Sequence, residues 1–166
     1  LARLHMVGAD VLVLDEATSA LDTETENAVM EAITSLQGQK TLIIIAHPEV
    51  DESSSQQFLL ASANPLENVT CKILTDKLYN IKEEQDLLAN HDRIIFQFPM
   101  YWYSAPYLLK KWLDDVFTNR MINGLLKNKE LGLVVTMGQS EDAFGAGRVE
   151  KFTLSELFKP FEALAN

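Results

Sequence analysis

The run Thr41-Leu42-Ile43-Ile44-Ile45-Ala46 decides the fold class, because an unbroken apolar, β-branched stretch indicates a strand that is buried on both faces. Similar strand-like runs follow at 69–74, 93–98 and 131–136, and a shorter one precedes it at 11–14. Helical patterns separate these runs. Repeated alternation of buried strands and helices predicts a mainly parallel sheet of five strands with helices on both faces.

The expected helices cover about 23–36, 53–63, 83–90, 106–117 and 152–165, with a kink at Pro160 in the last one. In a parallel α/β sheet the ligand site lies beyond the carboxyl ends of the strands. The sequence therefore predicts a ligand site at the loops that follow 41–46, 93–98 and 131–136.

Composition narrows the function classes. The 166 residues suit one compact domain, and the net charge of -10 argues against a nucleic-acid or anionic-membrane surface. A single cysteine excludes an intrachain disulfide. The sequence has no apolar run of membrane-spanning length and no visible signal peptide, so we expect a cytoplasmic location.

The string Val11-Leu12-Val13-Leu14-Asp15-Glu16-Ala17-Thr18-Ser19-Ala20-Leu21-Asp22 closely resembles the Walker B strand and D-loop of ABC-transporter ATPases. Residues 41–47 are similar to their switch-histidine strand, so the resemblance covers about 1–47. It implies that Asp15, Glu16 and His47 descend from residues that serve ATP hydrolysis. A phosphate-binding G-x-x-x-x-G-K-[ST] loop and an LSGGQ-type signature are missing from the sequence, so we expect neither ATP hydrolysis nor a resident metal ion.

A second resemblance begins near residue 44. The run Phe96-Gln97-Phe98-Pro99-Met100-Tyr101-Trp102-Tyr103-Ser104-Ala105-Pro106, with Thr136-Met137-Gly138-Gln139, resembles the flavodoxin-like NAD(P)H:quinone oxidoreductases. This resemblance covers about 44–166. It implies a flavodoxin-like three-layer sandwich that binds a flavin, takes hydride from NAD(P)H and reduces a quinone-like acceptor. It leaves FMN and FAD open, with FMN favoured, and it also allows an empty site and a homodimer.

In that family the three loops hold the flavin phosphates, one face of the ring and the other ring edge. The matching residues here are His47, Ser53, Ser55, Pro99, Met100, Tyr101, Trp102, Tyr103, Thr136, Gly138 and Gln139. The residues themselves agree, because serines at a helix start favour anions and an aromatic loop offers a flat wall. Two plainer interpretations stay open: His47 as a strand-end histidine, and the aromatic run as core residues that cover the sheet end.

The sequence departs from that family in three places. The segment 119–129 is short, Gln56 stands where the family has asparagine, and the family continues beyond 166 into a fifth strand and helix. Together the two resemblances favour a built chimera, and therefore recombinant production, over a natural fusion. The chimera would be one domain, 1–166, with an ATPase-derived strand-helix-strand at 1–47 and a reductase-derived part at 44–166. The strand at 11–14 would replace the missing fifth strand or lie beside 41–46.

Two functions remain open from the sequence. One is a flavoenzyme that uses NAD(P)H and a quinone-like acceptor. The other is a structural chimera without cofactor or activity. Both functions agree with the sequence, which therefore does not decide whether the chain is an enzyme.

The missing phosphate loop generates a prediction. Mg²⁺-dependent ATP hydrolysis by the purified protein should not exceed the background rate in a phosphate-release assay, because the sequence lacks the loop and its lysine that hold and neutralise the transferred phosphoryl group. Hydrolysis that Glu16→Gln abolishes would contradict it.

Overall fold

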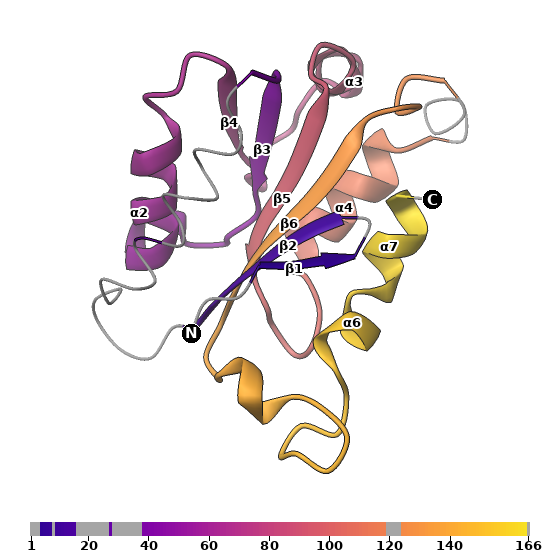
Figure 1. Ribbon diagram of the computed structural model, residues 1–166. Coiled ribbons are helices and arrows are strands. Elements are labelled where there is room, and N and C mark those ends of the chain that lie inside the picture. The colour runs from indigo at the N-terminus through magenta and orange to yellow at the C-terminus, as the bar shows by residue number, and fades with distance from the viewer. Residues whose placement is uncertain (1–3, 8, 16–26, 28–37, 119–123, 166) are drawn as a thin grey trace.

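The computed structural model describes residues 4–7, 9–15, 27, 38–118 and 124–165, and these residues form an α/β sandwich around one sheet (Figure 1). The strands in this part of the chain are β1 (Leu4–Val7), β2 (Ala9–Asp15), β3 (Thr41–Ile45), β4 (Val69–Ile73), β5 (Arg93–Pro99) and β6 (Glu130–Met137). The helices are η1 (Val50–Glu52), α2 (Ser54–Ala63), α3 (Ile81–Ala89), α4 (Tyr107–Val116), η2 (Glu141–Ala143), α6 (Leu154–Leu157) and α7 (Lys159–Ala165).

The strand order is β1-β2-β6-β5-β3-β4, and β1 alone among these strands runs antiparallel to its neighbour. The five expected strands are therefore present and parallel, and the flavodoxin-like fold class is confirmed. β1 was not predicted. The helix expected at 23–36 falls, apart from Asn27, outside the described residues.

The position of β2 resolves the alternative that the sequence left open. β2 pairs in parallel with β6, with Val13 opposite Val135, and thus takes the place beyond β6. The alternative beside β3 is wrong, because β3 already has β4 and β5 as its hydrogen-bonded neighbours. A parallel strand added at the open edge of β6 satisfies that edge without displacing an existing ladder.

The alternation of side chains along β3 builds two cores. Leu42 and Ile44 belong to a cluster with residues of α3, α4 and α7, whereas Ile43 and Ile45 pack with Ala63 of α2 on the opposite face. Figure 1 shows α2 on one side of the sheet and α4 with α7 on the other. The prediction that 41–46 is buried on both faces is confirmed, since these six residues are at most 5% exposed.

The helix boundaries differ from expectation at two places. The helix expected at 152–165 is divided into α6 and α7, with Phe158 as the cap between them. Pro160 lies two residues further on, where its ring and its missing N–H disfavour a continuous helix. α3 begins at Ile81, two residues earlier than expected, because the Asn80 side chain accepts a hydrogen bond from the Lys82 N–H.

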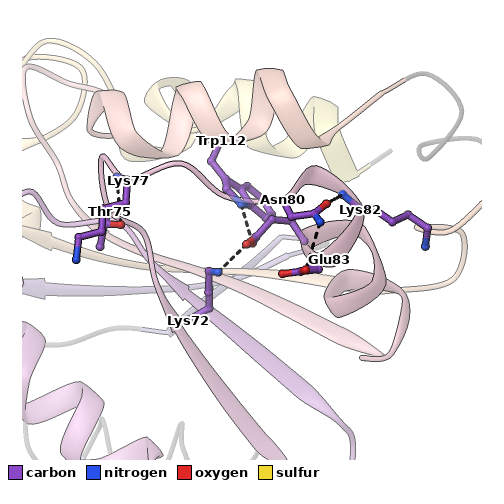
Figure 2. Close-up of polar contacts among 8 residues, drawn as sticks. Lys72, Thr75, Lys77, Asn80, Lys82, Glu83 and Trp112 are labelled. Atoms are coloured by element: carbon purple, nitrogen blue, oxygen red, sulfur yellow. Dashed lines mark hydrogen bonds and ion pairs between the residues drawn. The ribbon is translucent and has the colours of Figure 1, made fainter.

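Glu84 of α3 is buried, although charged side chains in the first turn of a helix are usually solvated. Glu84 is 4% exposed and accepts hydrogen bonds from Lys72 Nζ at 2.6 Å and Trp112 Nε1 at 3.1 Å. Figure 2 shows Lys72 and Trp112 directed at this carboxylate from β4 and α4. A buried carboxylate is stable only with such partners. Trp112 is a core residue, and its N–H is satisfied by Glu84.

No helix within the described ranges is long and apolar enough to cross a bilayer.

The buried carboxylate generates a stability prediction. Lys72→Met should lower the free energy of unfolding by about 2–4 kcal/mol, because Glu84 loses its positive partner inside the core. Lys82→Met is the matched control, since its ion pair with Asp86 is solvent-exposed and should contribute little. Urea unfolding followed by circular dichroism measures both, and equal effects of the two variants would contradict the interpretation.

Candidate functional site

Three loops begin at the same end of the sheet, where the carboxyl ends of the parallel strands lie: the first loop follows β3, the second follows β5 and the third follows β6. Ile45 lies opposite Gln97, and Pro99 lies opposite Thr136, so β3, β5 and β6 end side by side. The Met100 N–H donates to the Thr136 carbonyl at 2.8 Å, which holds the start of the second loop against the start of the third. The sequence prediction that these three loops converge is confirmed at the level of the backbone.

The first loop leads into the N-terminus of α2. Ser53 is the N-cap, and its Oγ accepts from the Gln56 N–H at 3.4 Å. The Ser54 and Ser55 N–H groups lie in the first turn, where a helix provides no carbonyl partner. A hydroxyl that accepts one hydrogen bond can still donate another, so Ser53 can join these N–H groups in holding an anion.

His47 makes its contacts with the first and second loops. Its Nδ1 accepts from the Glu49 N–H at 3.0 Å, and its Nε2 lies 3.4 Å from the Tyr101 hydroxyl. The rings of His47 and Tyr101 meet edge to face at a centroid distance of 6.2 Å. Both ring nitrogens are thus engaged within the protein, which favours the interpretation of His47 as a residue that supports the aromatic loop.

The second loop is a tight aromatic turn, defined here as residues 101–104. Tyr101 and Ser104 exchange two backbone hydrogen bonds of 2.9 and 3.1 Å. Between them Trp102 and Tyr103 have φ values of 49° and 66°, the left-handed region that bulky residues rarely adopt. Positive φ at both central positions is the geometry of a type I′ turn, usually occupied by Asn and Gly.

The aromatic turn faces solvent. Trp102 is 93% exposed, and the two flanking tyrosines are 43% and 49% exposed. The interpretation of this run as core that covers the sheet end is therefore wrong. Backbone strain of this kind clusters at ligand sites, where the surrounding structure compensates for it.

The third loop supports the turn from the other side. The Tyr103 hydroxyl donates to Glu150 Oε2 at 3.0 Å, and this hydrogen bond raises the pKa of Tyr103. Glu150 is itself fixed by backbone bonds of 2.8 Å to Ala143 and 3.0 Å from Gly145. At Gly138 an added Cβ would meet no atom within 4 Å, so the backbone there borders open space.

The remaining predicted site residues differ in exposure, and some of them are buried at the end of the sheet. Pro99 is buried in β5, and Met100 is half-buried against the core. The Thr136 hydroxyl is buried and accepts from Gln56 Nε2 at 3.2 Å. Gln139 is exposed, and Ser55 is half-buried. The flavin contacts of all these residues stay predictions.

Sequence reasoning missed one element of the site. Gln97 and Gln56 are 2% and 0% exposed, and Gln97 Nε2 donates to Gln56 Oε1 at 2.7 Å. The sequence feature that could have indicated it is Gln97, a polar residue between Phe96 and Phe98 in an apolar strand. A polar residue in an otherwise apolar buried strand needs a partner, and it therefore marks a specific contact.

This edge therefore combines anion-binding N–H groups, a flat exposed aromatic wall and open backbone. Such a combination suits a planar ligand that carries a phosphate. Within the described ranges, no group of three or more His, Cys, Asp or Glu side chains is arranged to hold a metal ion.

Comparison with known proteins agrees with this geometry. A family model described as "flavodoxin-like fold" matches residues 39–166. The uncharacterized NAD(P)H oxidoreductase YrkL of Bacillus subtilis is 39% identical over 135 residues, which are 76% of this chain and 78% of YrkL. The glutathione-regulated potassium-efflux ancillary protein KefG of Pectobacterium atrosepticum is 39% identical over 137 residues, covering 78% and 75% of the two chains.

Solved structures give the same result. An NADPH-quinone reductase from P. pentosaceus superposes with a TM-score of 0.73 at 51% identity, covering 76% of this chain and 77% of the other. General stress protein 14 of Treponema denticola, in complex with FMN, gives 0.69 at 31% identity, covering 76% and 78%. These relatives lend no support to the ABC-ATPase resemblance of residues 1–47. They establish that the chain belongs to the flavodoxin-like NAD(P)H oxidoreductase family.

Proposed function

We propose that this chain binds FMN at the edge where β3, β5 and β6 end, and that it uses the cofactor to pass hydride from NAD(P)H to a quinone-like acceptor. The observation that carries the proposal is the exposed aromatic turn, strained at Trp102 and Tyr103. It is supported by the FMN complex of the Treponema denticola relative and by the NADPH-quinone reductase of P. pentosaceus.

The phosphate end of the cofactor fits the start of α2. The N–H groups of Ser54 and Ser55 point out of a ten-residue helix, whose dipole favours negative charge at this end. Ser53 can donate its hydroxyl while it remains the cap. The exposed carboxylates of Asp51 and Glu52 lie just before this turn and oppose a phosphate, so we expect moderate affinity.

The ring end fits the aromatic turn. The exposed indole of Trp102 can lie against a flat heterocycle, and stacking of this kind excludes water from one ring face. Tyr101 is held by His47 and Tyr103 by Glu150, so the turn is braced from two loops. The bound flavin would supply the hydride chemistry, and the protein would supply position and exclusion of water.

We further propose that the chain is a built chimera forming one domain, with residues 1–47 taken from an ABC ATPase. The Walker B-like string at 11–22 supports this origin. The flavodoxin-like family match begins at residue 39, so residues 39–47 belong to both resemblances. The pairing of β2 with β6 agrees with a replacement at the open edge. The edge strands β1 and β4 offer surfaces for self-association into a homodimer.

A second candidate is a structural chimera that folds without binding a cofactor. One observation favours it: both ring nitrogens of His47 are engaged within the protein, by the Glu49 N–H and the Tyr101 hydroxyl. The two candidates differ in whether the protein binds FMN at micromolar concentration.

Flavin fluorescence titration tests the proposal. The wild type should quench FMN, and Trp102→Ala should weaken binding about tenfold or more, because one ring face loses its wall. Ser54→Ala is the control: it removes an exposed hydroxyl but keeps the backbone N–H, so affinity should change less than about threefold. Absence of quenching by the wild type would leave the structural chimera standing, and equal affinity of Trp102→Ala would show that the ring lies elsewhere.

The strained turn generates a second prediction. Trp102→Gly should raise the free energy of unfolding of the flavin-free protein by about 1 kcal/mol, because glycine adopts a φ of 49° without strain and the exposed indole contributes little burial. The same variant should lose FMN affinity. Chemical denaturation beside Trp102→Ala measures the gain, and a loss of stability would mean that the indole packs against the protein.

A further inference from the structure

We propose that Gln56 is a positioning residue that couples the phosphate end of the site to its ring end. The inference rests on the proposed function, since it assigns to a buried amide the task of fixing the distance between two parts of the FMN site. Gln56 would itself make no contact with the cofactor.

The amide of Gln56 is bound at both ends inside the protein. Its Oε1 accepts from Gln97 Nε2 at 2.7 Å, and its Nε2 donates to Thr136 Oγ1 at 3.2 Å. All three residues are at most 2% exposed. Gln97 is two residues before the end of β5, and Thr136 is one residue before the end of β6. One side chain thus joins α2 to both strands that carry the ring-side loops.

The backbone of the same residue sets the start of α2. The Gln56 N–H donates to Ser53 Oγ, the cap that orders the N–H groups of Ser54 and Ser55. Any displacement of this turn relative to β5 and β6 must break buried hydrogen bonds, and buried polar groups without partners are strongly disfavoured. The first turn of α2 and the aromatic turn are therefore held at one spacing.

A fixed spacing has a consequence for ligand discrimination. FMN engages both ends of the site at once, whereas riboflavin lacks the phosphate and engages the ring end alone. When the start of α2 and the aromatic turn are held at a fixed spacing, binding of the ring places the phosphate on its N–H donors, and neither segment has to be ordered further. Loss of this fixed spacing should weaken the binding of FMN more than it weakens the binding of riboflavin.

The test measures the ratio of the riboflavin Kd to the FMN Kd by fluorescence titration of the full chain. Gln56→Met removes the amide and keeps the length and volume of the side chain, and it should lower the ratio about fivefold or more. Gln85→Met is the matched control: Gln85 is half-buried on α3 and donates to the Val116 carbonyl at 3.2 Å, outside the site. Its ratio should stay within about twofold of the wild type.

Hydrogen exchange provides a readout without cofactor. In the flavin-free protein, the backbone N–H groups of residues 56 and 57 should exchange faster in Gln56→Met than in Gln85→Met, because the cap is no longer fixed to the strands. An unchanged ratio in a folded Gln56→Met protein overturns the inference and leaves Gln56 with a packing role. A wild-type ratio near one also overturns it, while the proposed function survives.

Two further results would also bear on the inference: a wild type that binds no flavin, and a Gln56→Met variant that does not fold. Absence of flavin binding by the wild type removes the proposed function, and the inference with it. If Gln56→Met does not fold, Gln97→Met decides, because it breaks the same chain of hydrogen bonds from β5 and leaves the sequence of α2 intact. It should lower the ratio in the same way, and an unchanged ratio for Gln97→Met overturns the inference.

Discussion

The burial of β3 on both faces is the constraint on which the rest of the structure depends. Leu42 and Ile44 fill the core beneath α3, α4 and α7, while Ile43 and Ile45 fill the core beneath α2. A strand buried in this way needs parallel neighbours on each side and helices above and below. That arrangement brings the ends of β3, β5 and β6 to one edge, and it thereby determines where a ligand can be held.

The polar groups at this edge are organised by long-range partners. Gln56 is 41 residues from Gln97 and 80 residues from Thr136 in the sequence, yet the three share one buried network. The aromatic turn is braced in a comparable way through His47 and Glu150. Strain at Trp102 and Tyr103 persists because these neighbours hold the turn from both sides.

Apart from β1 and the helix expected at 23–36, which lies almost wholly outside the described residues, the sequence predicted the order of the main strands and helices. It also predicted the convergence of the loops after β3, β5 and β6 and the burial of 41–46, since these follow from local periodicity and turn chemistry. It left the place of β2 open, because two sheet edges were consistent with the pattern. The burial of Glu84 depends on contacts with Lys72 of β4 and Trp112 of α4, and the Gln56–Gln97 bond depends on a contact between distant segments. Such features arise from tertiary packing, which a local pattern does not contain. The exposure of Trp102 likewise depended on the φ values of its turn.

A crystal structure of the full chain saturated with FMN tests the central claim most directly. The account predicts the phosphate on the N–H groups of Ser54 and Ser55 at the start of α2, with the isoalloxazine ring against Trp102. It also predicts that the Gln56 amide keeps its bonds to Gln97 and Thr136. FMN bound at another edge of the sheet, or an aromatic turn with no flavin against it at saturation, would contradict the account.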